Sequence, residues 1–363
     1  MYIKKLKLTN FRNYTSAELE FSALTNIIYG NNAQGKTNIL EAVYLFSQGK
    51  SYRAKTDKEL VKFDSDFAGL KIEFEDSERV HSGKMQILRD GRKAVRINHV
   101  NITKLSQLMN YLNVVMFSPE DLNIVKGSPN VRRRFTDSAI SQLYPSYLAS
   151  LMEYNKVLDQ KNSLLRSARL SGKNVRDTLW IWNEQLASVA VRIMNARREF
   201  IEQIASSAQT IGNDISGEKL SIRYVPNIRL EDIDAESVYT YLNERAEREI
   251  DAASSQYGIQ RDDLEIMING RDSKLYASQG QQRTAALSLK IAQSEYINEI
   301  KGEYPVLLLD DIMSELDIKR RMYLSERICD KQVLITSTDT DLVGKDTDTR
   351  LFRIEKGTVI DVS

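Results

Sequence analysis

The stretch Gly30–Thr37, GNNAQGKT, contains the residue types that hold the phosphates of a nucleotide. Glycines let the backbone wrap around an anion with its N–H groups pointing inward, Lys36 reaches the β and γ oxygens, and the Thr37 hydroxyl ligates Mg²⁺. An apolar run precedes the loop and a helical pattern follows it, which is the setting that a Walker A loop requires. We therefore expect nucleotide contacts from the whole loop: Gly30, Asn31, Asn32, Ala33, Gln34, Gly35, Lys36 and Thr37.

A second segment with residues that could do chemistry is VLLLDD, from Val306 to Asp311. Four apolar residues predict a buried strand that ends in two carboxylates. In a P-loop fold Asp310 would belong to the Mg²⁺ shell together with Thr37, and Asp311 would polarise a water that attacks the γ-phosphate. Because Asp311 is one methylene shorter than a glutamate, slow hydrolysis is expected. Lys36, Asp310 and Asp311 are thus the candidate catalytic residues.

The stretch SQGQQRTAAL, Ser278 to Leu287, has the pattern of a helix N-terminus that holds an anion. Ser278, Gly280 and Gln281 are its candidate phosphate contacts. One nucleotide is not easily enclosed by this segment and by Gly30–Thr37 if the two lie at opposite ends of one sheet. A second copy of the chain would supply the missing phosphate, so the segment predicts a dimer.

Both ends of the chain read as mixed α/β structure. The first forty residues predict strand, turn, strand, loop and helix, and residues 67–102 predict a β meander with a hairpin at Asp90 and Gly91. EIMING and KLYA read as strands around a turn at Gly270, and TAALSLKIAQSEYINEI reads as an amphipathic helix. YPVLLLDDI and QVLITSTD read as buried strands, and the last residues predict a hairpin at Lys356 and Gly357.

The middle of the chain is helical in pattern. Apolar residues recur at spacings of three and four on both sides of a polar loop around Gly172, which predicts an antiparallel helical hairpin. A second helix from about 178 to 211, capped by Asp177 or Thr178, would be roughly 50 Å long. A third helical stretch is expected to end at Gly258. The expected domains are a head of residues 1–135 and 259–363 and an arm of residues 136–258.

Composition narrows the class of protein. Of the 363 residues 42% are hydrophobic and 28% are charged, and the net charge is +1, which fits a globular chain with a real core. One cysteine, Cys329, and two histidines exclude an intrachain disulfide and a His/Cys zinc site. No apolar run approaches the ~18 residues of a membrane span, and we expect a cytoplasmic protein. Residues 132–200 nevertheless hold twelve basic against six acidic side chains.

Together these motifs carry a resemblance. GNNAQGKT, SQGQQR, LLLDD and SELD (Ser314 to Asp317) occur in the order found in the ABC-type ATPase superfamily. Within that superfamily the chain resembles the RecF family of bacterial recombination mediators. The resemblance rests on LTNFRNY, on FSPEDLNIVKGSPNVRRRFTD (Phe117 to Asp137), on QRDDLEIMING (Gln260 to Gly270) and on SQGQQRTAALSLKIAQ.

The resemblance implies an α/β fold: an ABC-type P-loop ATPase head assembled from both chain ends, with a short antiparallel coiled coil inserted as a helical arm. It implies an ATP-dependent, head-to-tail homodimer that binds DNA without sequence preference and acts as a weak, DNA-stimulated ATPase. With RecO and RecR as partners it would help to place RecA on gapped DNA in repair and replication restart. ATP and Mg²⁺ are the implied cofactors.

The same resemblance assigns further residues. Ser278, Gly280 and Gln281 would act in trans on the nucleotide of the partner, and Arg12 and Asn13 of FRNY would lie beside the nucleotide. Thr336 to Thr338 of TSTD would occupy the switch position, with Thr338 as a nucleotide contact. Two positions depart from the family pattern, Gln260 where a histidine is expected and Thr136 where an aliphatic residue is commoner.

DNA contacts are expected from basic side chains that neutralise phosphates. The candidates are Lys50, Arg53, Lys55, Lys84, Arg89, Arg92, Lys93, Arg96, Arg132, Arg133 and Arg134. Salt bridges within the protein would explain any one of these groups about as well. Two other functions stay open, the ATP-hydrolysing subunit of a membrane transporter and a chromosome-type ATPase with a long coiled coil. The helical insertion and the absence of a switch histidine in TSTD disfavour the transporter, and the short arm disfavours the long coiled coil.

Overall fold

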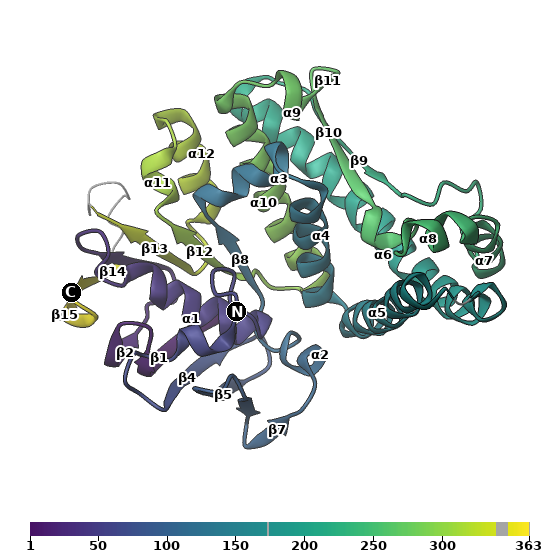
Figure 1. Ribbon diagram of the computed structural model, residues 1–363. Coiled ribbons are helices and arrows are strands. Elements are labelled where there is room, and N and C mark those ends of the chain that lie inside the picture. Colours follow the sequence, from purple (N-terminus) through teal and green to yellow (C-terminus); the bar gives the residue numbers. More distant parts are fainter. Residues whose placement is uncertain (173, 339–347, 363) are drawn as a thin grey trace. The chain divides into compact units, whose positions relative to one another are not determined.

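The computed structural model describes residues 1–172, 174–338 and 348–362 (Figure 1). The chain divides into two compact units. Unit 1 consists of Met1–Leu122, Asp214–Gly217 and Arg283–Ser363, and unit 2 of Asn123–Asn213 and Glu218–Gln282. The expected division into a head (1–135 and 259–363) and an arm (136–258) concerns functional modules and stays a prediction.

Unit 1 contains a six-stranded sheet that both ends of the chain build, in the order β15-β14-β3-β13-β12-β8. Its strands are β3 (Thr25–Tyr29), β8 (Val114–Phe117), β12 (Val306–Asp310), β13 (Val333–Ser337), β14 (Arg350–Glu355) and β15 (Thr358–Val362). All neighbours pair in parallel except β14 and β15, which form the predicted hairpin. Every residue of β8, β12 and β13 is buried, as predicted for β12 and β13. The carboxyl ends of the parallel strands meet at one edge, where ligands bind in such sheets.

The second sheet of unit 1 is antiparallel, in the order β2-β1-β4-β5-β6-β7. It consists of β1 (Tyr2–Phe11), β2 (Tyr14–Glu20), β4 (Phe67–Glu75), β5 (Val80–Leu88), β6 (Lys93–Ile97) and β7 (Val100–Ile102). The predicted meander with its turn at Asp90 and Gly91 is confirmed. The strand β2, by contrast, was not expected, because its pattern YTSAELE has only three apolar side chains.

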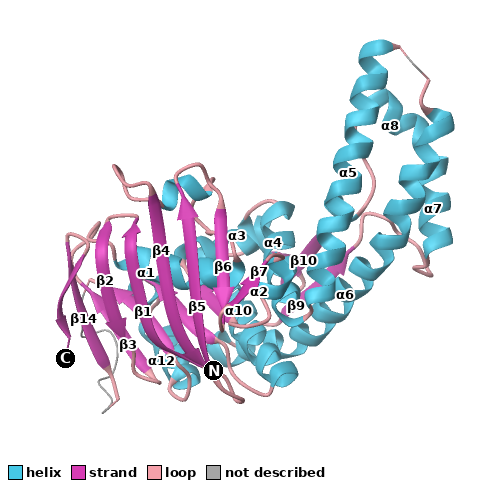
Figure 2. Ribbon diagram, turned by 90° about the horizontal axis from the view of Figure 1, so that it is seen from below, coloured by secondary structure: helices cyan, strands magenta, loops and turns pink. Residues whose placement is uncertain are grey.

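Helix α1 (Lys36–Gln48) packs in the core between these two sheets. The fit is close, since a Cβ at Gly83 of β5 would come within 2.2 Å of the Phe46 ring. Figure 2 shows the antiparallel sheet in front of α1. The other short helices of this unit are η1 (Asp57–Leu60), α2 (Leu105–Leu108), η2 (Pro119–Asp121), α11 (Ile312–Glu315) and α12 (Ile318–Ile328). Helix α10 (Gln279–Lys301) belongs to unit 1 from Arg283 onward, and most of its residues there are buried.

Unit 2 combines a helical hairpin with a small antiparallel sheet, β11-β10-β9. Its strands are β9 (Leu220–Val225), β10 (Asp263–Ile268) and β11 (Arg271–Asp272). Its helices are α3 (Leu122–Lys126), α4 (Pro129–Leu143), α5 (Pro145–Ser171), α6 (Arg176–Ser216), α7 (Ala235–Glu244), α8 (Ala246–Ala252), η3 (Ile259–Arg261) and α9 (Ser273–Tyr276). The hairpin of α5 and α6 is the predicted one, and Gly172 ends α5 in a left-handed conformation.

Three details of unit 2 differ from the sequence prediction. Helix α6 has 41 residues and is about 60 Å long, because its apolar stripe continues beyond residue 211; it begins at Arg176, ahead of the expected caps. The third helical stretch is broken at Arg245 into α7 and α8. The prediction of a strand at KLYA is wrong, because Asp272 accepts hydrogen bonds from the N–H groups of Lys274 and Leu275 and starts the helical turn α9.

Within the residues that the structure describes, no helix is both long enough and apolar enough to cross a membrane.

Candidate functional site

The loop between β3 and α1 has a backbone that few side chains would permit. Gly30 has φ +146°, and a Cβ there would lie 2.3 Å from the carbonyl oxygen of Ile354. Gly35 has φ +115°, and a Cβ there would lie 2.6 Å from the Asn13 amide. The two glycines therefore allow both the wrapped conformation of the loop and its close contact with neighbouring segments.

Two distant segments hold this loop in place. From the turn between β1 and β2, the Asn13 amide donates to the Gln34 carbonyl at 2.9 Å and the Tyr14 hydroxyl donates to the Gly35 carbonyl at 3.0 Å. From the β14–β15 hairpin, the N–H of Gly357 donates to the Gln34 carbonyl at 3.0 Å, and the N–H of Lys356 donates to the Gln34 side chain at 2.6 Å. The loop is thus preorganised by contacts from both ends of the chain, and Asn13 lies beside it.

The ammonium of Lys36 lies against its own loop. It donates to the carbonyls of Gly30 at 2.7 Å and Asn31 at 3.1 Å, and the residue is 4% exposed. Burial lowers the pKa of Lys36, while Asp311 and Asp310 oppose that shift. A buried ammonium with two acidic neighbours is well suited to neutralise an anion that enters the loop.

Three hydroxyl groups converge on Asp310 at the carboxyl end of β12. The hydroxyls of Thr37 and Thr336 each donate to Oδ1 at 2.8 Å, and the Tyr52 hydroxyl donates to Oδ2 at 3.3 Å. The sequence predicted the pair of Thr37 and Asp310, and the structure brings these residues together. Tyr52 was missed, since it stands alone in the loop after α1 and only the tertiary fold brings it to β12.

Asp311 follows in a strained and partly open position. It has φ +50°, its N–H donates to the Thr336 hydroxyl at 2.9 Å, and its carbonyl accepts from Ser314 at 2.8 Å. Burial raises the pKa of the Asp311 carboxyl; Lys36 opposes the shift and Asp310 adds to it. A carboxylate with a raised pKa near a cationic loop is the type of group that serves as a general base.

Arg12 also lies close to this region but is held by α1. Its guanidinium binds both oxygens of Glu41, at 2.9 and 2.6 Å, and donates to the Glu59 carbonyl at 3.1 Å. Glu41 is fully buried and also accepts from the Ser51 hydroxyl at 2.5 Å. Sequence reasoning missed Glu41, because a glutamate in a helix gives no sign of a buried arginine partner. A direct nucleotide contact of Arg12 stays a prediction.

The segment predicted to act in trans lies at the start of α10, in unit 2. Ser278 and Gln281 cap each other: the Gln281 N–H donates to the Ser278 hydroxyl at 3.2 Å, and the Ser278 N–H donates to the Gln281 side chain at 2.8 Å. The Gln281 amide also donates to Glu218 at 2.6 Å. Ser278 is exposed and Gly280 lies in the first turn. The predicted helix N-terminus is confirmed, and its reciprocal bonds are those of a capping box.

Thr338 follows β13 directly and is exposed. Asp339, the last residue of TSTD, lies outside the described residues.

Several of the basic residues expected to contact DNA instead have partners within the protein. Arg132 binds Asp263 through two bonds of 2.6 and 2.8 Å, and Arg133 donates to the Asp262 carbonyl at 2.7 Å. Lys93 pairs with Asp57 at 2.6 Å, and Arg89 donates to the carbonyls of Ser65 and Lys62. The other candidates have exposed side chains: Lys50, Arg53, Lys55, Lys84, Arg92, Arg96 and Arg134. Among them, Arg53 contacts Asn38 and Glu41, Arg92 pairs with Asp90, and Arg96 donates to Asn101.

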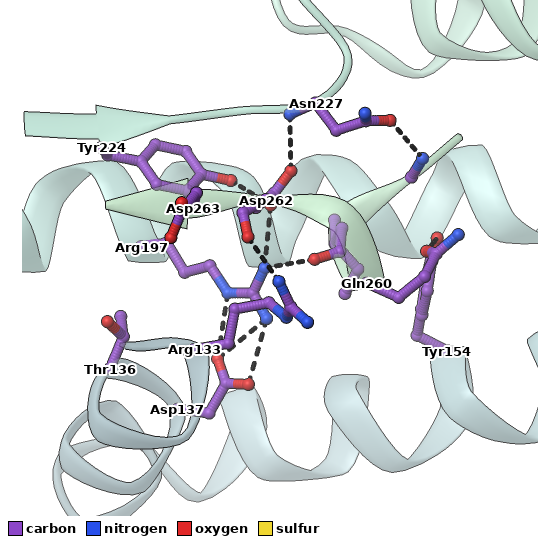
Figure 3. Close-up of polar contacts among 12 residues, drawn as sticks. Arg133, Thr136, Asp137, Tyr154, Arg197, Tyr224, Asn227, Gln260, Asp262 and Asp263 are labelled. Atoms are coloured by element: carbon purple, nitrogen blue, oxygen red, sulfur yellow. Dashed lines mark hydrogen bonds and ion pairs between the residues drawn. The ribbon is translucent and has the colours of Figure 1, made fainter. Parts of the chain in front are cut away.

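A buried polar cluster in unit 2 explains the motifs RRRFTD and QRDD (Figure 3). Arg197 of α6 is 2% exposed. It binds both oxygens of Asp137 at 2.9 and 3.0 Å, and it donates to Asp262 at 2.8 Å. Tyr224 also donates to Asp262. Figure 3 shows α4, α6 and the segment before β10 joined through these side chains.

The two positions that depart from the family pattern lie in the same region. The side-chain oxygen of Gln260 accepts from the Tyr154 hydroxyl at 2.6 Å, and its amide donates to the Tyr257 carbonyl at 2.8 Å. The Thr136 hydroxyl donates to the Arg132 carbonyl at 3.1 Å. Both residues are therefore satisfied within unit 2 and have structural roles there.

Comparison with known proteins assigns the chain to a family. Residues 2–359 match the family model described as "RecF/RecN/SMC N terminal domain". The chain is 40% identical over 371 residues to the DNA replication and repair protein RecF of Staphylococcus haemolyticus, covering 99% of this chain and 100% of the relative. It is 41% identical over 372 residues to the RecF of Bacillus velezensis, with the same coverage. The chain belongs to the RecF family.

Solved structures agree with this membership. The fold matches a structure of the recombination mediator protein RecF with ATP in the RecFOR pathway, with a TM-score of 0.92, 36% identity and coverage of 100% of this chain and 97% of that chain. An Smc head bound to the C-terminal winged-helix domain of ScpA matches with a TM-score of 0.57 at 16% identity, which concerns the fold alone. The expected fold class is confirmed: an ABC-type ATPase head, with a helical arm, as in RecF-family and Smc head structures.

Proposed function

We propose that this RecF-family protein is an ATP-controlled, DNA-binding recombination mediator of the cytoplasm. ATP binding would join two copies head to tail on DNA, and slow, DNA-stimulated hydrolysis would release them. With RecR and RecO the protein would help to load RecA at gapped DNA during repair and replication restart. The match to a RecF structure with ATP supports the choice of nucleotide.

The observation that carries the proposal is the convergence of three segments at one edge of the parallel sheet. Lys36 and Thr37 begin α1, Asp310 and Asp311 end β12, and Thr336 of β13 hydrogen-bonds to both aspartates. Such an arrangement places a cation, a metal-binding hydroxyl and two carboxylates within one site. These are the groups that phosphoryl transfer requires.

The donor set fits Mg²⁺. The Thr37 hydroxyl and Asp310 Oδ1 lie 2.8 Å apart, and both are the hard oxygen ligands that this ion takes alongside waters and phosphates. Bound there, Mg²⁺ would neutralise charge on the phosphates. The residues of the chain would do the rest: loop N–H groups and Lys36 bind the phosphates, Thr336 orients Asp310, and Asp311 accepts a proton from water.

The dimer is inferred from the second candidate anion site, at the start of α10. The exposed N-terminus of α10 presents partial positive charge and N–H groups, and its Ser278 hydroxyl accepts from the N–H of Gln281 in the same turn. In the proposed dimer this turn faces the γ-phosphate held by the other copy. Dimerisation would then depend on ATP.

The experiment that tests the nucleotide site is light scattering of the whole protein with and without ATP. Lys36→Ala should abolish the ATP-dependent increase in mass, because the phosphates lose their buried cation. Lys58→Ala, an exposed lysine of η1, is the matched control and should dimerise as the wild type does. An undiminished mass shift in Lys36→Ala would contradict the site.

A second pair of variants tests the action in trans. Ser278→Arg should leave ATP binding intact and abolish dimerisation, because the added side chain fills the space of the partner's γ-phosphate. Ser278→Ala removes the same helix cap, at a cost of about 1 kcal/mol, but adds no bulk, so it should still dimerise. If Ser278→Arg dimerises normally, the reading in trans is wrong.

The transporter alternative has no observation in its favour beyond the shared ATP motifs. It would require ATP turnover that is stimulated by a membrane partner and insensitive to DNA. Measuring phosphate release with and without gapped DNA separates the two functions.

A further inference from the structure

The outer face of the antiparallel sheet carries a continuous row of basic side chains. Strand register makes Lys7 of β1 the partner of Lys71 of β4, Lys71 the partner of Lys84 of β5, and Lys84 the partner of Arg96 of β6. Four neighbouring strands therefore place a cation at the same level. We call Lys7, Lys71, Lys84 and Arg96 the basic row.

This arrangement is unfavourable for the fold by itself. Like charges directly opposite each other destabilise a sheet, whereas pairs of alternating sign stabilise it. The adjacent row shows that alternation: Lys5 lies between Glu20 of β2 and Glu73 of β4. The basic row thus retains a charge pattern that stability alone would not select.

The residues at the two ends of the row have partners, whereas the two lysines at its centre form no ion pair among the described residues. Lys7 pairs with Glu18 at 3.0 Å, and Arg96 donates to the Asn101 side chain at 2.7 Å. Lys71 and Lys84 are exposed, and neither forms an ion pair with any acid among the described residues. The two central ammonium groups are therefore open to an external anion.

On the side of the row away from Lys5 and Glu73, the neighbouring surface of the sheet is uncharged. The next register level consists of small or neutral side chains: Ser16, Thr9, Gly69, Gln86 and Ala94. Figure 2 shows this face of the sheet with no helix of unit 1 in front of it. The small side chains of this strip leave room for an extended anion beside the row, and the Phe67 ring borders the strip at Gly69, 3.9 Å from where a Cβ would lie.

We propose that the basic row binds the sugar-phosphate backbone of DNA. This inference rests on the proposed function and names the surface that carries out its DNA-binding part. Strands about 4.8 Å apart make the row roughly 14 Å long, which matches about four nucleotides of one strand at 3.4 Å each. Contacts to phosphates carry no information about the bases, so binding by the row is expected to be independent of sequence.

The row favours DNA over an acidic protein as the partner. Neither the row nor the neutral strip beside it contains an aromatic or large aliphatic side chain, and protein interfaces use such residues as anchors. A regular line of cations on a rigid sheet matches a regular line of phosphates instead.

The test is the binding of a fluorescent random-sequence duplex to the full-length protein with ATP, followed by anisotropy between about 50 and 200 mM salt. Lys71→Ala/Lys84→Ala should weaken binding by up to about eightfold per lysine at 0.1 M salt, since each lost phosphate contact removes about 0.9 from the slope of log K against log salt. The slope should fall by about 1.8 in total. Lys5→Ala, on the same face of the sheet but on β1 and between acids, should change affinity about twofold or less.

Two controls separate the inference from folding and from the proposed function. The double variant should unfold at the same or higher denaturant concentration, because like-charge repulsion is removed, and it should still dimerise with ATP. If the wild-type protein binds DNA and the double variant binds with the same affinity and the same salt slope, the basic row is not the DNA-binding surface, while the proposed function stands. If the wild-type protein binds no duplex even at low salt, the DNA-binding part of the proposed function fails and the inference fails with it.

Discussion

Two pairs of consecutive aspartates stand at strand ends in this protein, and their surroundings differ. Asp262 and Asp263 precede or begin β10 in unit 2, while Asp310 and Asp311 end or follow β12 in unit 1. The first pair meets Arg197, Arg133 and Arg132, and its oxygens accept bonds from these and other internal donors. The second pair meets hydroxyls and one ammonium.

The difference shows how aspartates that stabilise the fold can be distinguished from aspartates that act in catalysis. Asp262 is 1% exposed, and both of its oxygens are hydrogen-bonded to donors of unit 2. Asp311 is only partly buried, and the hydrogen bonds of its backbone, to Thr336 and from Ser314, hold it in place. A buried cluster in which every charge is paired within the protein stabilises one conformation. A carboxylate that is held in place but partly exposed can instead act on a substrate.

The largest expected effect comes from removing Arg197, the cation of the buried cluster that contains Asp137 and Asp262. Arg197→Ala leaves the buried Asp262 and the half-buried Asp137 without this cation, which should lower the free energy of unfolding by about 3–5 kcal/mol. Denaturant unfolding of the full chain measures this loss. Arg192→Ala on the same helix removes an exposed pair with Glu153 and should cost about 1 kcal/mol or less.

A variant that fails to fold would leave that comparison open, so Arg197→Lys provides a second measurement. It keeps the charge but loses the two-bond contact with Asp137, and its stability should fall between those of the wild type and Arg197→Ala. Equal stability of all three proteins would show that the cluster contributes nothing.

Changes at the second pair, Asp310 and Asp311 (the open pair), are expected to alter the rate of ATP hydrolysis. Asp311→Asn removes the proposed base and should slow ATP hydrolysis by about 10²-fold or more, while ATP binding and ATP-dependent dimerisation persist. Phosphate release in single-turnover conditions is the measurement. Turnover within a few fold of the wild type would exclude Asp311 as the base.

The pH dependence sharpens the same comparison. Burial raises the pKa of Asp311, so the acid limb of the wild-type rate should lie above the ~3.9 of a free aspartate, and Asp311→Asn should lose that limb. The raised pKa also means that the folded state holds this proton more tightly than the unfolded state. The free energy of unfolding should therefore fall as pH rises from the ordinary to the raised pKa, and Asp311→Asn should remove that loss.

The sequence predicted those parts of the site that depend on local spacing. The Walker A loop, the apolar strand before Asp310 and the capped start of α10 each follow from residues that are neighbours in the chain. Contacts across the fold were out of reach: the helical pattern around Glu41 does not indicate its arginine partner, and Tyr52 stands alone in a loop. The family resemblance gave Asn13, whose bond to the Gln34 carbonyl no local rule indicates.

The charge pattern misled for the same reason. Arg132 and Arg133 looked like part of a DNA-binding patch, yet their partners lie some 130 residues further along the chain. Lys7 and Lys71, by contrast, gave no signal: Lys7 is one of three lysines in β1 and Lys71 is the single lysine of β4, and neither belongs to a local cluster with Lys84 and Arg96. Only the register of the sheet brings them next to Lys84 and Arg96.

A smaller effect is expected where one hydroxyl serves both aspartates of the open pair. Thr336→Val removes the donor to Asp310 and the acceptor for the Asp311 N–H, so turnover should fall about tenfold if the two lost bonds are worth about 0.5–1.5 kcal/mol each. Thr336→Ser keeps the hydroxyl and should recover most of the rate. Equal rates for the valine and serine variants would show that the hydroxyl does not orient the carboxylates.

The smallest effect is expected at Tyr52, at the edge of the open pair. Its hydroxyl donates to Asp310 Oδ2 at 3.3 Å, a long bond, while its ring packs edge-on against Tyr44 at 5.2 Å. Tyr52→Phe keeps the ring and loses only the bond, so turnover should fall about two- to fivefold, the equivalent of about 0.5–1 kcal/mol, with stability unchanged. The role of Tyr52 is tested by measuring turnover as a function of Mg²⁺ concentration. If Tyr52 orients a metal-binding carboxylate, Tyr52→Phe needs more Mg²⁺ to reach its half-maximal rate. If the tyrosine is purely structural, that Mg²⁺ concentration is the same as in the wild type.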